Sequence, residues 1–405
     1  MPIVAYHRFC QTRQEAGQWR VLRAVGPSQA GRTGVDGRSV INFSSNNYMG
    51  LATHPALIRR SQEWTDRWGV GATASRLVCG NLALFAPIEA KLSQGKGTEA
   101  ALIFNSGFQA NATVLAALLD RAVLGEEPLV FADRFNHASL HHGCRVAGVR
   151  QFRYRHNDLN HLEMLLKKYA RRPGPRFIVS ETVFSMDGDC CDVAGLIALK
   201  ERYGAFLYLD EAHATGVLGV DGFGLAAAYP GQVDLVMGTF SKGLGGFGAY
   251  VACSQAVKAY LVNQCGGFVY STALPPGVLG AMDAALDLLP VLGESRERLQ
   301  RNSAWVRQVW QAAGLATGLS STQIIPLLLG GEAETLEMSG RLKAAGILAV
   351  AIRPPTVPVG TSRIRFSLTA LHGEADLRYL VETVLRLGGC AADCSVHERS
   401  DVAPN

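Results

Sequence analysis

Apolar residues form two kinds of stretch that alternate along the chain from about residue 50. Compact apolar runs of strand length occupy 99–104, 129–133, 176–181, 205–211 and 234–240. Apolar residues with helical spacing occupy the intervening or flanking stretches 55–68, 84–94, 108–120, 158–170 and 193–203. Continuous apolarity is typical of strands that are covered on both faces. The pattern therefore predicts an α/β fold with a mostly parallel central sheet between helices.

The pattern changes after about residue 290, where a long amphipathic helix is expected over 294–313. Strand, helix, strand, strand and helix then follow at 324–330, 332–345, 349–355, 363–369 and 374–387. This order predicts a smaller C-terminal α/β domain. We expect four parts: an N-terminal arm over 1–45, a large domain over 46–290, a small domain over 291–388 and a flexible tail over 389–405.

The composition narrows the class of protein. Of the 405 residues, 48% are hydrophobic and 18% are charged, which is enough apolar material for a sizeable core. The net charge of +5 is mild and lacks the clustered basic stripe of a nucleic-acid binder. Nine scattered cysteines without zinc-like spacing fit a reduced compartment, and no run approaches the roughly 20 apolar residues of a membrane span. We therefore expect a cytoplasmic protein that binds neither nucleic acid nor membrane.

Two charged residues stand at the ends of predicted strands. Asp210 ends one apolar run, and Lys242 follows another among small residues with almost no charge nearby. Ligands bind at the carboxyl edge of an open parallel sheet, and a lysine that loses hydration there should have a lowered pKa. A lysine for the aldehyde and an aspartate for the ring nitrogen are what pyridoxal 5'-phosphate needs. Taken alone, the two residues fit a salt bridge between strand ends at least as well.

Two other patterns are less specific. Residues 243–248 satisfy the G-x-G-x-x-G pattern of dinucleotide-binding proteins, but a strand-like run follows them instead of a helix. These glycines fit a tight turn of the backbone better. His137 and His141 have i, i+4 spacing, but no carboxylate or cysteine completes a metal-binding set, so no metal is expected.

Several longer motifs occur in the order and at the spacing of one known family. The segments are INFSSNNYMGL at 41–51, NSGFQAN at 105–111, NHASLHHG at 136–143, SETVFSMDGD at 180–189, DEAHATGVLG at 210–219, TFSKGLGG at 239–246, YSTALPP at 270–276 and the stretch 351–372. Together they resemble the α-oxoamine synthases, which are fold-type I pyridoxal-phosphate enzymes. The resemblance implies an aspartate aminotransferase-like fold, pyridoxal 5'-phosphate as cofactor, and a C-acyltransferase that joins an amino acid to an acyl thioester.

The resemblance assigns a role to each residue around the cofactor ring. Lys242 would hold the aldehyde and then move protons at the amino acid's α-carbon. Asp210 would pair with the ring nitrogen, and His137 would stack on the ring face. His213 and Ser185 would hydrogen-bond the phenolic oxygen of the ring.

The phosphate group would lie at the start of a helix in NSGFQAN. Gly107 and Phe108 stand there, and backbone N–H groups at a helix start attract an anion. The resemblance adds the hydroxyl of Thr239 from the same subunit and that of Thr272 from a neighbouring subunit. It therefore implies a homodimer whose active site is shared between subunits.

The substrate residues follow from the same comparison. Arg365 would bind the amino-acid carboxylate with a planar, two-pronged cation, and Arg363 is expected on the opposite face of that strand. Asn47 would lie near the ring and the substrate. Arg353 would support this region or bind the acyl chain, and Arg20 or the nearby Arg23 could reach a distal carboxylate.

The substrates themselves are indicated by two short stretches. The string Arg-Pro-Pro-Thr-Val-Pro at 353–358 is most similar to the branch of the family that serves biotin synthesis, and Ser75 is compatible with alanine. The resemblance thus implies L-alanine and either pimeloyl-CoA or pimeloyl-acyl carrier protein. Two alternatives stay open: an α-oxoamine synthase with a different acyl donor, and a nicotinamide-dependent oxidoreductase that uses the glycines at 243–248.

Overall fold

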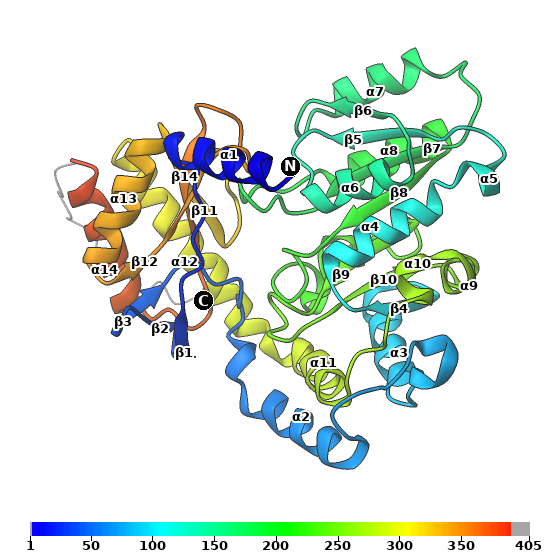
Figure 1. Ribbon diagram of the computed structural model, residues 1–405, viewed down its shortest axis with the longest axis horizontal. Coiled ribbons are helices and arrows are strands. Elements are labelled where there is room, and N and C mark those ends of the chain that lie inside the picture. The colour runs from blue at the N-terminus through cyan, green and yellow to red at the C-terminus, as the bar shows by residue number, and fades with distance from the viewer. Residues whose placement is uncertain (1, 390–405) are drawn as a thin grey trace, which may run out of the picture.

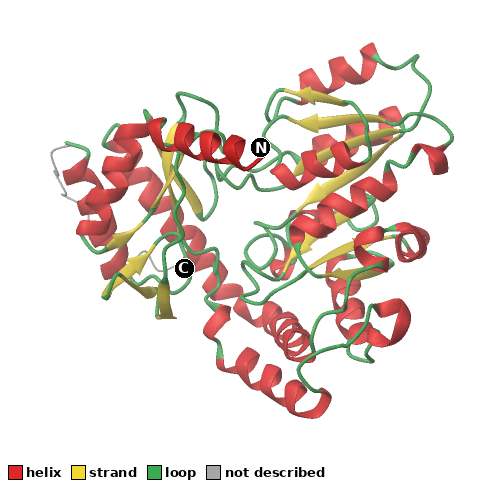
Figure 2. Cartoon of the chain, in the orientation of Figure 1, coloured by secondary structure: helices red, strands yellow, loops and turns green. Residues whose placement is uncertain are grey.

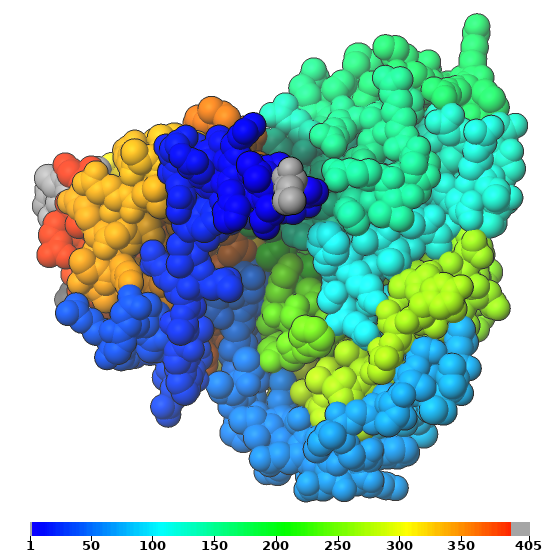
Figure 3. Space-filling view, viewed as in Figure 1, coloured from blue at the N-terminus to red at the C-terminus, as the bar shows by residue number. Residues whose placement is uncertain are grey.

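A computed structural model of the protein describes residues 2–389. Apart from Gly389, the predicted flexible tail lies outside the described residues. The molecule has a large part around a seven-stranded sheet and a smaller part with two short sheets (Figure 1). A hollow separates the two parts on the face shown in Figure 3.

The central sheet has the strand order β4-β10-β9-β8-β7-β5-β6, and in it only β10 runs antiparallel to its neighbours. The strands are β4 (Ala100–Phe104), β5 (Leu129–Asp133), β6 (Gln151–Tyr154), β7 (Arg176–Glu181), β8 (Ala205–Asp210), β9 (Leu235–Thr239) and β10 (Ala249–Cys253). β4, β5, β9 and β10 are buried along their whole length, as continuous apolarity predicts. The predicted mostly parallel sheet is confirmed.

Helices cover both faces of this sheet (Figure 2). The covering helices are α4 (Gly107–Leu118), α6 (Ala138–Val146), α9 (Gln255–Gln264) and α10 (Gly266–Val269) on one face, and α7 (Leu159–Lys168) and α8 (Val193–Tyr203) on the other. Successive residues of one strand point to different faces, so Val130 packs in one core cluster and Phe131 in the other. A short helix, α5 (Arg121–Leu124), precedes β5.

A third core cluster joins the two parts of the molecule. It includes residues of α2 (Pro55–Trp68), α3 (Phe85–Lys96), α11 (Pro276–Leu288) and α12 (Gly293–Ala312). α11 packs closely against α2. A Cβ at Gly280 of α11 would stand only 2.5 Å from the carbonyl oxygen of Arg60 in α2, so a glycine is needed at this contact. Among the described residues, the helical run Pro276–Ala312 has the length and composition to cross a membrane, although half of its most apolar stretch is buried. No such run was expected from the sequence, and this burial is typical of a core helix.

The smaller part contains most of the predicted C-terminal domain. β11 (Ile324–Gly330), β14 (Ser362–Ser367) and β13 (Val350–Ile352) form one antiparallel sheet, with α13 (Glu332–Ala344) and α14 (Glu374–Leu387) beside it. The N-terminal segment joins this part. Its strands β1 (Val25–Gln29), β2 (Arg32–Val35) and β3 (Arg38–Asn42) form a sheet with β12 (Ile347–Leu348). α1 (Pro2–Glu15) precedes them and extends toward the large part (Figure 1).

Candidate active site

A cavity of about 260 Å³ lies at the carboxyl edge of the central sheet. This is the edge where open parallel sheets bind ligands, and the volume is near the lower end of the roughly 300–1,000 Å³ typical of ligand pockets. Seven predicted cofactor residues line it: Gly107, Phe108, His137, Asp210, His213, Thr239 and Lys242. The remaining lining residues were not predicted from the sequence; they are Ser106, Asn111, Ser139, Glu181, Ala212, Met237 and Ser241.

Lys242 follows β9, and its Nζ lies 2.8 Å from His213 Nε2. Burial lowers the pKa of Lys242 to about 8, with a further contribution from the Arg365 cation, although the carboxylates of Asp210 and Glu181 oppose the change. This is the direction that the sequence predicted. A lysine with such a pKa can act as a nucleophile or a base near neutral pH.

Asp210 is buried at the end of β8, and both oxygens of its carboxylate are held. Asn111 Nδ2 donates to Oδ2 at 2.7 Å, and the backbone N–H of Ala212 donates to Oδ1 at 2.8 Å. Tyr208 donates its hydroxyl proton to Asn111 Oδ1 at 2.7 Å, which fixes the orientation of that amide. The cavity therefore has a carboxylate of fixed position, as a protonated pyridine nitrogen requires.

Glu181 ends β7 and stands directly beside Asp210 in the sheet register. Its carboxylate accepts a hydrogen bond from the backbone N–H of His137. Burial raises the pKa of Glu181 well above its ordinary value, and the charge of Asp210 adds to this effect. Glu181 was not predicted from the sequence, although it ends an apolar run much as Asp210 does.

His137 caps α6 at the wall of the cavity. Its Nδ1 lies 2.7 Å from Ser139 Oγ, which accepts from Asn111 Nδ2 at 2.9 Å. Burial lowers the pKa of His137, so the ring is neutral at physiological pH. A neutral ring fixed at the cavity wall suits the predicted stacking role.

The start of α4 supplies an anion site in the same cavity. Ser106 caps this twelve-residue helix by accepting the backbone N–H of Gln109 at 3.2 Å. The first N–H groups of a helix have no partner within it, and Gly107 and Phe108, the first two residues of α4, both line the cavity. The hydroxyls of Thr239 and Ser241 lie 2.6 Å apart and also line it.

Arg365 on β14 reaches this cavity through a buried network. Its Nη2 donates to Tyr48 Oη at 3.2 Å, and Tyr48 Oη lies 2.7 Å from His213 Nδ1. Arg365 Nη1 donates to Ser367 Oγ at 2.7 Å, and Nε donates to the carbonyl of Ser185. The structure thus brings together three predicted site residues, namely Arg365, Ser185 and His213.

Arg363 corrects one expectation. It donates from Nη1 to Asp187 Oδ1 at 2.5 Å and to the carbonyl of Met186 at 3.3 Å, next to the Ser185 carbonyl that Arg365 binds. The prediction of opposite faces was wrong, because side chains of a strand alternate and residues two apart share a face. Both arginines therefore hold the same loop of the large part.

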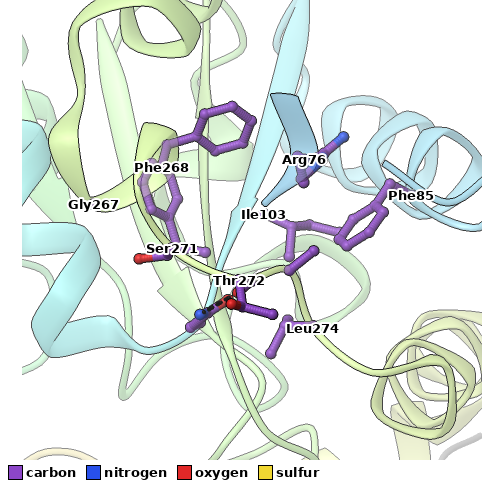
Figure 4. Close-up of a pocket in the computed structure, with 11 residues that line it drawn as sticks. Arg76, Phe85, Ile103, Gly267, Phe268, Ser271, Thr272 and Leu274 are labelled. Atoms are coloured by element: carbon purple, nitrogen blue, oxygen red, sulfur yellow. Dashed lines mark hydrogen bonds between the residues drawn. The ribbon is translucent and has the colours of Figure 1, made fainter. Parts of the chain in front are cut away.

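Thr272 does not line the cavity of its own chain. It bridges Ser75, and its carbonyl accepts from Asn105 Nδ2 at 2.9 Å. Figure 4 shows Thr272 in a separate small pocket, together with Arg76. Ser75 immediately precedes this arginine, whose guanidinium lies 4.0 Å from the ring centre of Phe85.

The remaining substrate residues lie in two places. Arg20 Nη2 donates to Thr356 Oγ1 at 3.2 Å, and Arg353 Nη1 donates to the carbonyl of Gly17. The N-terminal segment and the loop after β13 are therefore side by side. Asn47 lines a different small pocket, so its predicted place near the ring stays a prediction.

These groups fit pyridoxal 5'-phosphate. A lysine of lowered pKa, a fixed carboxylate, a neutral imidazole and a helix start surround one cavity of suitable size. A lysine for the aldehyde, a carboxylate for the ring nitrogen and N–H groups for the phosphate are all present. The fold and this site define a fold-type I pyridoxal-phosphate enzyme.

Comparisons with known proteins support this class of enzyme. The profile of the family "Aminotransferase class I and II" matches residues 38–384. A relative from Magnetococcus marinus is 66% identical over 385 residues, which are 95% of this chain and 98% of the relative. The 8-amino-7-oxononanoate synthase of Gluconacetobacter diazotrophicus is 59% identical over 341 residues, 84% of this chain and 85% of that protein. The serine palmitoyltransferase of S. paucimobilis, solved with bound PLP, superimposes with a TM-score of 0.87 at 26% identity, over 95% of this chain and 97% of that one. The chain belongs to the aminotransferase class I and II family and, within it, to the α-oxoamine synthases.

Proposed function

We propose that this enzyme condenses L-alanine with pimeloyl-CoA or pimeloyl-acyl carrier protein. The products are 8-amino-7-oxononanoate, carbon dioxide and the free thiol, and the reaction serves biotin synthesis. The observation that supports this most is the 59% identity to the 8-amino-7-oxononanoate synthase of Gluconacetobacter diazotrophicus over most of both chains.

Bound pyridoxal phosphate supplies an electron sink for the bond that breaks at the α-carbon of alanine. Arg365 would bind the alanine carboxylate, and Asp210 would keep the ring nitrogen protonated. Lys242, whose pKa is lowered to about 8, would hold the cofactor aldehyde and, once alanine has taken its place, would accept the α-proton as a base. His213 Nε2 lies 2.8 Å from Lys242 Nζ, within hydrogen-bonding distance of this base.

The α-carbon would then bond to the thioester carbonyl, and the sulfur would leave as a thiolate with the electron pair of the carbon–sulfur bond and take a proton from solvent to become the free thiol. Loss of the alanine carboxyl group as carbon dioxide frees the same carbon for a proton from Lys242. We propose that Arg20 and Arg353 hold the distal carboxylate of the pimeloyl chain. The contact between Arg20 and Thr356 supports this, because it places both arginines at one edge of the smaller part.

We further propose a homodimer in which Thr272 binds the phosphate of the neighbouring subunit. Thr272 lies outside the cavity of its own chain. Large apolar side chains lie exposed around it: Leu77 is 51% exposed, Val78 79% and Tyr270 87%. A second copy would cover them and bring its own Thr272 to the cavity.

The test is the visible absorption spectrum of the purified protein with added pyridoxal phosphate. A band of lysine-bound cofactor should appear, change with L-alanine, and change again on addition of pimeloyl-CoA with release of thiol. The likeness to serine palmitoyltransferase supports one competing substrate. A band that ignores alanine but responds to serine or glycine would therefore keep the family and overturn the proposed substrates.

A further inference from the structure

The chain makes a hairpin over residues 183–190, shortly after β7, and the two ends of this hairpin pair with each other. Within it, the backbone N–H of Gly188 donates to the carbonyl of Phe184 at 2.8 Å. This hydrogen bond closes a turn over residues 185–187. The turn belongs to the large part of the molecule, but most of its contacts lie in the smaller part.

The segment before β11 holds one end of this turn. The carbonyl of Gly188 accepts from the backbone N–H of Ser321 at 3.0 Å, from the N–H of Thr322 at 3.1 Å and from Thr322 Oγ1 at 2.8 Å. A Cβ at Gly188 would stand 2.0 Å from the carbonyl oxygen of Ile324. The two backbones are therefore in direct contact at this point.

Two arginines of β14 hold the tip of the turn. Arg365 donates from Nε to the carbonyl of Ser185. Arg363 donates from Nη1 to Asp187 Oδ1 at 2.5 Å and to the carbonyl of Met186 at 3.3 Å. Arg363 is 4% exposed, and an arginine buried to this extent is costly to leave without a partner. Its ion pair with Asp187 should therefore favour one position of the turn.

The position of the turn also affects the guanidinium of Arg365. Of its five N–H groups, the one on Nε is taken by the Ser185 carbonyl, while Nη2 binds Tyr48 and Nη1 binds Ser367. A shift of the turn would pull on Arg365 or break its contact through Nε. Arg363 is not among the described residues that line the cavity. An effect of Arg363 on the site must therefore pass through the turn.

We propose that Arg363 is a positioning residue whose ion pair with Asp187 holds the 185–187 turn on β14 and thereby keeps Arg365 and Ser185 in place for the reaction. The proposal rests on the proposed function only in assigning the amino-acid carboxylate to Arg365 and a cofactor contact to Ser185. Any amino acid with an α-carboxylate would depend on this pair in the same way.

Arg363→Met is the direct test, because methionine fills the space of the arginine stem and removes the cation. The Asp187 side chain is 25% exposed, so water can hydrate it once its partner is lost, and the variant should fold. Hydrogen exchange of the holoenzyme reports on the turn, where the N–H of Gly188 should exchange about tenfold faster. Titration of the visible cofactor band with the amino acid should give a dissociation constant about tenfold higher.

Three further variants separate positioning from general support of the fold. Arg363→Lys keeps a cation for Asp187 but loses the fork of donors, so both quantities should lie between wild type and Arg363→Met. Asp187→Ala in the Arg363→Met background should weaken amino-acid binding no further, because the pair is already broken. Val384→Ala removes core volume in α14 and should lower the unfolding temperature while it changes neither quantity.

The role of Arg363 is overturned if Arg363→Met lowers the unfolding temperature but leaves both the exchange of Gly188 and the amino-acid dissociation constant unchanged. Equal effects of Val384→Ala on these two quantities would also overturn it, since any loosening of the smaller part would then suffice. A wild-type cofactor band that ignores alanine but responds to serine or glycine would overturn only the proposed substrate, and the titration is then made with the amino acid that acts. A wild-type protein that forms no cofactor band would overturn the proposed function and this role together.

Discussion

Lys96 Nζ and Glu211 Oε2 lie 2.5 Å apart, and both side chains are fully buried. Glu211 directly follows Asp210, and its other oxygen accepts from the backbone N–H of Ala226 at 2.8 Å. The ion pair therefore fixes the loop that places Asp210 and His213 at the cavity. A charge that loses its partner in such a place is costly, because no water can replace the lost contact.

Replacing Lys96 with Met should lower the free energy of unfolding by about 3–5 kcal/mol, because Glu211 would stay buried without its cation. Urea unfolding of the holoenzyme measures this loss. Lys167 provides the matched control, since it pairs with Glu163 at 3.1 Å at the surface and its removal should cost below about 1 kcal/mol. Similar losses of unfolding free energy for the two variants would show that the buried ion pair stabilises the fold no more than the surface pair does.

Replacing Lys242 with Ala should abolish the band of lysine-bound cofactor and reduce turnover by at least about 10²–10⁴-fold, because the base is lost. Lys168→Ala is the control, because it also removes one lysine; it should retain both the cofactor band and the turnover. The experiment also tests the alternative class of enzyme. A nicotinamide-dependent oxidoreductase that used the glycines at 243–248 would keep its activity in Lys242→Ala.

Replacing Arg365 with Lys should weaken amino-acid binding about 10- to 100-fold, because an ammonium group cannot bind a carboxylate with two parallel hydrogen bonds. The guanidinium now holds Ser367, Tyr48 and the carbonyl of Ser185 at once, and a lysine cannot make all three contacts. Titration of the cofactor band with L-alanine gives the dissociation constant. An unchanged dissociation constant would show that Arg365 does not bind the amino-acid carboxylate.

His156 should make stability depend on pH. Its Nδ1 lies 3.0 Å from Asp133 Oδ1, and its Nε2 lies 2.9 Å from Asp189 Oδ2. Burial alone would lower the pKa of His156, but the two carboxylates outweigh it and raise the pKa to about 9. Because the folded-state pKa exceeds the unfolded value of about 6.5, the stabilisation is complete below pH 6.5 and is lost as pH rises through about 9.

The variant His156→Gln should therefore lose up to about 3 kcal/mol of unfolding free energy at pH 6, and the difference from wild type should shrink above pH 9. Urea unfolding at both pH values measures this. His161→Gln is the control, since the ring of His161 accepts the backbone N–H of Arg155 at 2.8 Å. A difference between His156→Gln and wild type that stays constant with pH would mean that His156 is not charged in the folded protein.

The central sheet and its functional edge could be predicted because their signals are local. Five apolar runs marked five of the seven strands; Asp210 stands near the end of one of those runs, and Lys242 comes shortly after another. Tyr48 could not be assigned this way, since its contacts depend on partners far away in the chain, whereas Glu181 ends the apolar run 176–181 and was not selected. Tyr48 meets Arg365 only when the N-terminal segment has joined the smaller part. Side chains along a strand alternate between its two faces, so the shared face of Arg363 and Arg365 could have been predicted from their spacing.

The pairing of β3 with β12 also constrains how the chain is made. Ile41 on β3 pairs with Ile347 on β12. The ribosome therefore has to add 347 − 41 = 306 further residues after Ile41 before its partner has been synthesised. At the roughly 5–20 residues per second of protein synthesis, that delay is on the order of 15–60 s. During this time β3 has a free edge, which is a ready template for pairing with another chain. Slow or paused translation of this gene should therefore favour aggregation through residues 38–42, before the enzyme has completed its smaller part.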